Sequence, residues 1–158
     1  MLRRATIDDA PAIRALTREA YAKWVPLIGR EPKPTGADYV EAVQKHRIDL
    51  LCAGSDPAAL IEMIPGAGHL LIENVAVSPA FQRRGLGRKL MAHAEKVAAS
   101  LGYGEIRLYT DKRFVENIEL YGKLGYRIDG EEATAGGVRV RMSKRLASRG
   151  GPTCSTSP

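Results

Sequence analysis

Hydrophobic and polar residues alternate along this 158-residue chain in two different periods, which predicts strands and helices interspersed in one domain. Short aliphatic runs bounded by turn residues predict strands over residues 3–7, 48–53, 58–64, 69–77, 105–110, from 126 onward and 138–144. Apolar residues at helical spacing predict helices after Asp8 or Asp9 and over residues 37–45, 86–101 and 115–124. Pro and Gly between residues 26 and 36 predict a loop of irregular backbone. This order of elements indicates an α/β or α+β fold with a mixed sheet.

The strand over residues 69–77 stands out because both of its faces are apolar. Ile72 and Ala76 would lie on one face, and Val75 and Val77 on the other. A strand that is apolar on both faces is typical of the centre of a sheet. We therefore expect this strand to be central, with the helix over residues 86–101 directly after it in the chain.

A basic glycine loop, QRRGLG at residues 82–87, joins that strand to that helix. The first N–H groups of a helix have no intrahelical partner, and the helix N-terminus carries partial positive charge, so such a loop suits an anion. Gly85 and Gly87 let the backbone approach a ligand closely, and Arg83, Arg84 and Arg88 add positive charge. The pattern predicts a phosphate-binding site, although it is neither GxxxxGK[ST] nor GxGxxG. The alternative is an ordinary helix start with solvated arginines.

Composition narrows the class of protein. With 44% hydrophobic and 27% charged residues the chain is typical of soluble globular proteins, and it shows no membrane-length apolar run or signal peptide. Two cysteines form no disulfide framework and no metal-ligand spacing is present, so we expect a cytoplasmic protein without a metal. We expect one domain over residues 1–146 and a disordered tail over residues 147–158.

The net charge of +6 invites a nucleic-acid interpretation. Much of the excess lies in the glycine loop and in the basic residues between 139 and 149, where a polyphosphate cofactor and a solvated edge strand would account for it. No DNA- or RNA-binding motif is evident. Nucleic acid is therefore not expected as the main partner.

Two segments together resemble the GNAT superfamily of acetyl-CoA-dependent N-acetyltransferases. The loop QRRGLG resembles the family's (Q/R)-x-x-G-x-(G/A) signature, and NIELYGKLGY at residues 117–126 resembles the family's later helix, both in the expected order. The resemblance covers about residues 3–146. It implies a central, mostly antiparallel sheet of about six to seven strands, splayed between the fourth and fifth, with about four helices. Many relatives dimerise through sheet edges or the last strands, so the resemblance raises a homodimer as one alternative, but the sequence does not give the oligomeric state.

The resemblance also implies where acetyl-CoA would bind. The loop would hold the pyrophosphate, and the strand backbone before it would pair with the pantetheine arm. A bulge or splay near Asn74 and Val75 would aim a backbone amide at the thioester carbonyl and stabilise the oxyanion. The implied cofactor-binding residues are Val75, Ala76, Val77, Gln82, Arg83, Arg84, Gly85, Leu86, Gly87, Arg88, Asn117 and Tyr121.

Glu73 is the candidate general base. An amine with a pKa of about 10.4 is mostly ammonium at neutral pH, and only its neutral form attacks a thioester. Glu73 shares its strand face with Val75 and Val77, where a lone buried carboxylate is costly without a function. The alternative is that Glu73 pairs with a neighbouring arginine or reaches solvent.

Tyr121 is the candidate general acid for the departing CoA thiolate, a role that rests on the resemblance of its helix to the family helix. Its spacing alone also fits a core tyrosine. Asn117, one turn earlier, lies on the same helix face and could bond the cofactor arm or an ordered water. It could equally be a surface amide. The three histidines are expected at the surface or at strand ends.

The acceptor is expected at the loop over residues 21–39, where Tyr21, Trp24 and Tyr39 could form an aromatic wall. Trp24 could equally plug the core beneath the proline-rich loop. We interpret the chain as an N-acetyltransferase that moves the acetyl group of acetyl-CoA to a primary amine in a ternary complex. The alternative is a non-catalytic acyl-CoA-binding sensor or interaction module, which would need neither Glu73 nor Tyr121.

Overall fold

The computed structural model describes residues 1–28 and 37–146. The expected disordered tail at residues 147–158 lies outside the described residues. The strands are β1 (Leu2–Arg4), β2 (Arg47–Ala53), β3 (Asp56–Pro65), β4 (Leu70–Val77), β5 (Glu105–Asp111), β6 (Arg127–Thr134) and β7 (Gly137–Arg145). The α-helices are α1 (Ala10–Tyr21), α2 (Val25–Ile28), α3 (Tyr39–Lys45), α4 (Leu86–Ser100) and α5 (Val115–Lys123). Short 3₁₀ turns lie at Ile7–Asp9, Ala22–Trp24 and Pro79–Phe81.

The strands follow the order β1-β2-β3-β4-β5-β7-β6 in a seven-stranded sheet. The pairs β1–β2, β2–β3, β5–β7 and β6–β7 are antiparallel. A mixed, mostly antiparallel sheet with interspersed helices is the expected α/β (α+β) fold class, which the structure confirms. The chain forms two compact units, unit 1 from Met1–Ile64 and Ile72–Ala92, and unit 2 from Pro65–Leu71 and the described residues from His93 onward.

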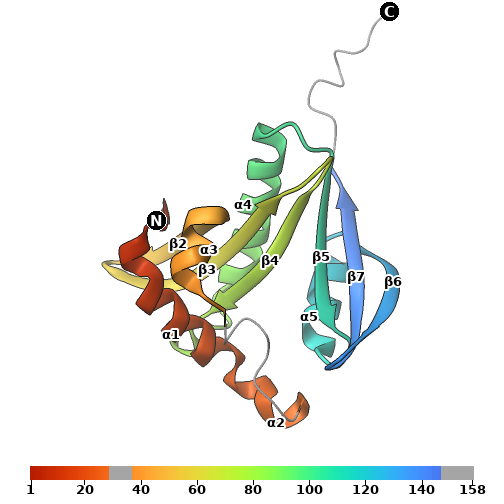
Figure 1. Cartoon of the computed structure of the whole chain (residues 1–158), viewed down its shortest axis with the longest axis horizontal. Helices are drawn as coiled ribbons and strands as arrows, with labels where there is room; N and C mark the ends of the chain where they lie inside the picture. The colour runs from red at the N-terminus through yellow and green to blue at the C-terminus, as the bar shows by residue number, and fades with distance from the viewer. Residues whose placement is uncertain (29–36, 147–158) are drawn as a thin grey trace, which may run out of the picture. The chain divides into compact units, whose positions relative to one another are not determined.

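The core of unit 1 lies between α1, α3 and one face of the strands β2 and β3. Figure 1 shows α1 and α3 in front of these strands. Alternate residues of each strand point into this core, as the period of two requires. The buried residues of the cluster are Ala10, Ile13, Leu16, Ala20, Tyr39, Ala42, Ile48, Leu50, Leu60 and Ala76.

Side chains fix the 3₁₀ turn that leads into α1 and the start of α3. The N–H of Thr6 donates to Asp9 at 2.8 Å, and Arg3 donates to both carboxylate oxygens of Asp9 at 2.8 and 2.9 Å. Asp38 caps α3 by accepting from the N–H groups of Val40 and Glu41. A carboxylate that accepts from backbone N–H groups therefore holds the 3₁₀ turn before α1 and the beginning of α3.

Strand β4 is the fourth of the seven strands, which confirms the prediction that it is central, but its two faces are not equally buried. Ile72, Asn74 and Ala76 are buried, whereas Val75 and Val77 are only half-buried and Glu73 is exposed. The face that carries Glu73, Val75 and Val77 is therefore partly open to solvent. A ligand could approach the strand backbone from this face.

Unit 2 is built on the three strands β5, β7 and β6. Its register runs continuously from Glu105 opposite Arg145 to Asp111 opposite Arg139. The pairing of β6 with β7 shifts by one residue between Ile128 and Gly130. Helix α4 ends at a glycine with φ of +85°, Gly102, as the sequence predicts.

Several predicted boundaries were wrong for local reasons. Strand β1 ends at Arg4 because Thr6 begins the hydrogen-bonded turn that leads into α1. The β2–β3 turn is Gly54 and Ser55, since Asp56 already pairs with Ala53. Pro26 lies inside the short α2 rather than in irregular backbone, at the first turn, where proline is tolerated.

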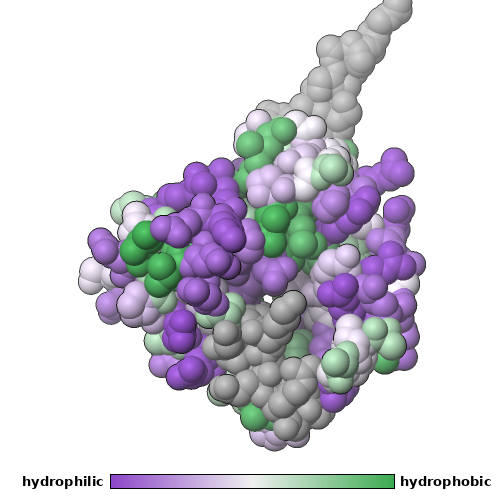
Figure 2. All heavy atoms as spheres, viewed as in Figure 1, coloured by the Kyte–Doolittle hydropathy of each residue, from purple (hydrophilic) through white to green (hydrophobic). Residues whose placement is uncertain are grey.

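Hydrophilic residues cover much of the visible face in Figure 2, and hydrophobic residues form separate areas between them. The exposed large hydrophobic side chains are scattered over several elements and include Val40, Leu101, Val115 and Ile128. Single exposed apolar residues of this kind are ordinary in folded proteins. None of the described helices is long and apolar enough to cross a membrane.

Candidate functional site

The basic glycine loop lies in unit 1, between β4 and α4. The first intrahelical hydrogen bond of α4 runs from Lys89 N to Gly85 O at 3.1 Å, so the N–H groups of Leu86, Gly87 and Arg88 precede the helical ladder. A Cβ built at Gly87 would meet nothing within 4 Å. The end of the helix therefore presents backbone N–H groups beside open space, which is the arrangement that an anion needs.

Two features hold the loop in shape. Gln82 Nε2 donates to the carbonyl of Val77 at 3.2 Å, which ties the loop to the end of β4. Arg83 and Gly85 both adopt left-handed backbone, with φ of +67° and +76°. Left-handed residues turn successive N–H groups toward one side, a geometry typical of anion-binding nests.

The loop is positively charged and exposed. Arg83, Arg84, Arg88 and Lys89 are exposed, and none forms an ion pair with another described residue. Arg84 stacks over the ring of Phe81, with 5.2 Å between the guanidinium carbon and the ring centroid. These residues could hold a polyphosphate without first giving up a carboxylate partner.

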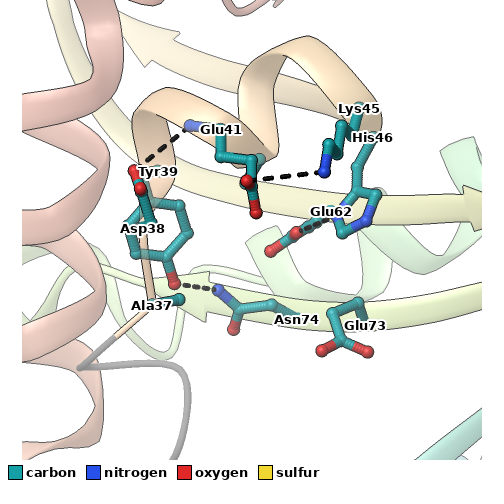
Figure 3. Close-up of a pocket in the computed structure, with 10 residues that line it drawn as sticks. Ala37, Asp38, Tyr39, Glu41, Lys45, His46, Glu62, Glu73 and Asn74 are labelled. Carbon is teal, nitrogen blue, oxygen red and sulfur yellow. Dashed lines mark hydrogen bonds and ion pairs between the residues drawn. The ribbon is translucent and has the colours of Figure 1, made fainter.

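A pocket of about 160 Å³ lies in the same unit as the glycine loop, between α3, β3 and β4. Figure 3 shows the charged and polar side chains that gather around it. The lining residues are Ala37, Asp38, Tyr39, Glu41, Ala42, Lys45, His46, Glu62, Glu73 and Asn74. Two of these were predicted as site residues, Tyr39 and Glu73.

Asn74 is the buried polar centre of this wall. Its Oδ1 accepts from the hydroxyl of Tyr21 at 2.8 Å, and its Nδ2 donates to the hydroxyl of Tyr39 at 3.2 Å. Asn74 is 3% exposed. The amide thereby joins α1 and α3 to β4, and it brings together two of the three aromatic residues proposed for the acceptor loop.

Tyr39 is a core residue as well as a lining residue. Its side chain is 1% exposed, and burial raises the pKa of its phenol to about 12. Trp24 is half-buried beneath the ammonium of Lys23, 4.9 Å from its ring centroid, and does not line the pocket. The predicted aromatic wall is therefore represented here by the hydroxyl groups of Tyr21 and Tyr39.

Glu73 lies beside Asn74 on β4 and lines the same pocket (Figure 3). It is exposed and makes no hydrogen bond or ion pair with any described residue. The expectation that it shares a buried apolar face is wrong, because that face of β4 is open. An exposed carboxylate without a protein partner can bind a cation or accept a proton from one.

Glu62 and His46 form a pair that sequence reasoning missed. Glu62 Oε2 lies 2.6 Å from His46 Nδ1. Glu62 is 4% exposed, and burial raises the pKa of its carboxyl, while the hydrogen bond from His46 opposes that shift. His46 was expected at the surface or at a strand end, and it lies directly before β2, where its ring contacts the buried Glu62; the contact itself was not predicted. The signal in the sequence that could have revealed this pair was Glu62 itself, a carboxylate inside the otherwise apolar run of residues 58–64.

The remaining predicted residues belong to unit 2. Asn117 and Tyr121 lie one turn apart on α5, and both are half-buried. The ring of Tyr121 lies 6.1 Å from that of Tyr126, and desolvation raises the pKa of the Tyr121 phenol to about 12. Among residues 1–28 and 37–146, no three His, Cys, Asp or Glu side chains group so as to hold a metal ion.

Solved structures share this fold. The chain resembles the PaiA N-acetyltransferase of Thermoplasma acidophilum in complex with coenzyme A, at 18% identity and a TM-score of 0.77, covering 92% of this chain and 98% of that one. It also resembles the ribosomal-protein-S18-alanine N-acetyltransferase of Escherichia coli, at 19% identity and a TM-score of 0.73, covering 99% of each chain. A third similar structure is aminoglycoside 6'-acetyltransferase type Ii, at 21% identity and a TM-score of 0.74, covering 94% of this chain and 99% of that one.

Sequence comparison identifies the family. No curated protein matches this chain by sequence. The family model described as the acetyltransferase (GNAT) family matches residues 13–126, which include the glycine loop, the pocket residues Glu62 and Glu73, and Tyr121. The match covers most of the chain, and the chain therefore belongs to the acetyltransferase (GNAT) family.

Proposed function

We propose that this protein transfers the acetyl group of acetyl-CoA to a primary amine by direct attack in a ternary complex. The observation that carries the proposal is that β4 bears a carboxylate-lined pocket and then leads directly into the basic glycine loop, both within unit 1. An exposed carboxylate, Glu73, lines a pocket on β4, and the same strand leads into a basic loop with backbone N–H groups beside open space. One feature suits a cationic acceptor and the other a polyphosphate donor.

The residues present fit the cofactor. The N–H groups at the start of α4, together with Arg83, Arg84 and Arg88, would hold the pyrophosphate, and the open side of Gly87 leaves room for it. The β4 backbone over Val75, Ala76 and Val77 would pair with the pantetheine arm. Gln82 supports the loop from behind through its bond to Val77. When bound, acetyl-CoA supplies the activated acyl group as a thioester.

Glu73 would accept the proton that the acceptor ammonium must lose before its nitrogen can attack. The neutral amine then forms the C–N bond, and the C–S bond breaks. The amide of Val75 would donate to the oxyanion that develops on the carbonyl oxygen. The ammonium loses two protons over the whole reaction, of which one ends on the CoA thiol and one in solvent.

Tyr121 would donate to the departing sulfur. Because the pKa of its phenol is raised to about 12, it keeps its proton at neutral pH and is always available as a donor. Asn117, one turn earlier on α5, would bond the cofactor arm or an ordered water.

The names of two similar proteins support an amine acceptor, since one is a ribosomal-protein-S18-alanine N-acetyltransferase and the other an aminoglycoside 6'-acetyltransferase. One of the similar structures, the PaiA N-acetyltransferase, is a complex with coenzyme A. Cys52 is a free, half-buried thiol, which is compatible with the reducing cytoplasm that we propose as the compartment.

The direct test is an amine panel in which release of the free CoA thiol is followed with a thiol reagent. We expect acetyl-CoA-dependent release with at least one primary amine and formation of the acetylated amine by mass spectrometry. Tight acetyl-CoA binding without turnover on any amine would instead indicate the acyl-CoA-binding module.

The cofactor assignment is tested most cleanly at Gly87, because Gly85 has a left-handed φ and any side chain there would also strain the backbone. Gly87→Glu should weaken acetyl-CoA binding at least tenfold in calorimetry, since it introduces a negative side chain where phosphate is expected. Gly104→Glu is the matched control, because a Cβ at Gly104 also meets nothing within 4 Å and its φ is not left-handed. Unchanged affinity in Gly87→Glu would exclude the loop as the phosphate site.

A further inference from the structure

The pocket holds a second carboxylate whose state differs from that of Glu73. Glu62 projects from β3, on the strand beside β4, and its carboxylate lies within the pocket wall next to His46 (Figure 3). Glu73 is exposed, whereas Glu62 is almost fully buried. The two carboxylates interact electrostatically, because the charge on Glu73 makes ionisation of Glu62 less favourable.

The geometry of the pair leaves two positions for a proton. With the imidazole proton on Nδ1, that N–H donates to Glu62 Oε2 across 2.6 Å, and Glu62 Oε1 makes no hydrogen bond to another described residue. The Nε2 atom of His46 is then an acceptor as well. The His46 side chain is 29% exposed and that of Glu62 is 5% exposed, so the pair reaches from the pocket wall to solvent.

Side chains from three elements, α3, β4 and β2, lie around the His46–Glu62 pair. Tyr39 and Lys45 face the pocket from α3, where Lys45 pairs with Glu41 at 3.4 Å. Glu73 faces it from β4. On β2, Ile48 lies opposite Glu62 in the register and brings no charge. Lys45 already has a carboxylate partner, whereas His46 is the side chain that hydrogen-bonds Glu62 directly.

We propose that the His46–Glu62 pair holds the proton that leaves the acceptor ammonium and returns it to solvent through the exposed edge of His46. The proposal rests on the proposed acetyl transfer. Glu73 receives the proton first, directly or through water, and the pair takes it from there. His46 and Glu62 thus act as positioning and proton-holding residues behind the group that touches the substrate.

The proton count balances along this route. The ammonium N–H bond breaks and leaves its electron pair on nitrogen, and the proton passes through Glu73 to His46 Nε2. There the added charge is shared across the 2.6 Å bond, as imidazolium with carboxylate or as imidazole with carboxyl. The Nε2–H bond then breaks and water takes the proton. An ordinary carboxylate with a pKa near 4.3 holds a proton poorly at neutral pH, and burial raises the pKa of the Glu62 carboxyl while His46 opposes part of that rise. The buried carboxylate is therefore better matched to the task than an exposed one.

The test is the pH dependence of kcat/KM in Glu62→Gln, which keeps the shape of the side chain and its hydrogen bond to His46. We expect a loss of roughly 10- to 100-fold at pH 7. The loss should shrink to a few-fold near pH 10, because the amine, with a pKa of about 10.4, then needs less help to lose its proton. A profile parallel to that of the wild type at all pH values would overturn the proposal.

Asp49→Asn is the matched control. Asp49 is also a buried carboxylate in unit 1 that bonds a cation, Arg47, at 3.1 Å, but it lies outside the pocket. This variant should lose stability without changing the shape of the pH profile. If it altered the profile as Glu62→Gln does, general destabilisation would explain both results and the proposal would fail.

A second measurement does not depend on turnover. The wild-type protein, labelled with ¹⁵N-histidine and ¹³C-carboxyl glutamate, is titrated by NMR over the range of roughly pH 5 to 9 in which imidazoles exchange protons. We expect one proton to be taken up with concerted shifts at His46 and Glu62, and the His46 curve to move in Glu62→Gln. Independent or absent titration of the two groups would overturn the proposal. Absence of turnover on every amine, with the concerted titration present, would fail only the proposed function.

Discussion

Tyr121 is a phenol that stays protonated throughout the pH range in which an enzyme of this kind would work. Desolvation raises its pKa to about 12. It lies beside Tyr126, whose hydroxyl is buried without a hydrogen-bond partner among the described residues. Removing the hydroxyl of each tyrosine in turn therefore distinguishes a chemical role of the Tyr121 phenol from a structural role of either residue.

Tyr121→Phe should lower kcat by roughly 10- to 100-fold, because the departing sulfur loses a donor. The wild-type pH–rate profile should show no falling limb assignable to Tyr121 below about pH 10, since deprotonation begins only as the pH approaches its raised pKa of about 12. Stopped-flow or steady-state assays of CoA thiol release measure both kcat and its pH dependence. Tyr126→Phe is the control and should leave kcat near the wild-type value. Full turnover in Tyr121→Phe would remove the acid from the mechanism.

Single residues also show how far the site could be predicted from the chain. The loop residues and Glu73 follow from local spacing, because a strand, a glycine loop and a helix are neighbours in the chain. The pairing of His46 with Glu62 is a tertiary contact between the end of α3 and β3, and local patterns do not encode it. Asn74 was noted only for its backbone, yet its side chain joins Tyr21 to Tyr39.

At the scale of elements, one carboxylate connects β1 to α1. Asp9 accepts from the backbone of Thr6 and from the guanidinium of Arg3, and these bonds lower its pKa from 3.8 to about 2. A carboxyl whose pKa is depressed on folding stabilises the folded state above its unfolded pKa. That stabilisation is lost as the pH falls through the folded pKa.

Asp9→Asn should therefore lower the free energy of unfolding by about 2 kcal/mol at pH 7. The deficit should shrink between pH 4 and pH 2, the interval set by the two pKa values of Asp9, and vanish below it. Chemical denaturation at several pH values measures this. Asp8→Asn changes the charge equally at an exposed acid that makes no ion pair with a described residue, and it should have little effect. A deficit in Asp9→Asn that is independent of pH would contradict the linkage.

The elements themselves were predictable where apolar periodicity was long. Helix α4 and strand β4 fall within one residue of expectation at both ends. Short elements were misjudged because side-chain hydrogen bonds decided their limits, as Thr6 and Asp9 do at the end of β1. The central position of β4 was predicted correctly, but the partial exposure of one of its faces was not, because apolar residues on an open face look, in sequence, like those on a covered one.

For the whole molecule, the net charge of +6 becomes easier to interpret once the loop is known. Four basic side chains of the loop are exposed without carboxylate partners among the described residues. Exposed charges act at a range limited by ionic strength, so their contribution to ligand binding should be sensitive to salt.

We expect the Kd of acetyl-CoA to rise by roughly three- to tenfold between about 50 and about 500 mM NaCl, because salt screens the loop from the phosphates. Calorimetry measures it. Pantetheine, which lacks phosphates, should bind weakly with a Kd that does not respond to salt. A Kd for acetyl-CoA that is equally insensitive would mean that the basic residues contribute nothing to cofactor binding.

Arg83 shows that the loop exchanges stability for charge. A non-glycine residue with φ of +67° costs roughly 1–2 kcal/mol relative to ordinary backbone, and glycine would relieve that cost. Selection for stability alone would favour glycine at this position. If the loop binds the cofactor phosphates as proposed, arginine at residue 83 adds a cation beside the start of α4 at the expense of folding free energy, and Arg83→Gly would give a more stable protein that binds more weakly.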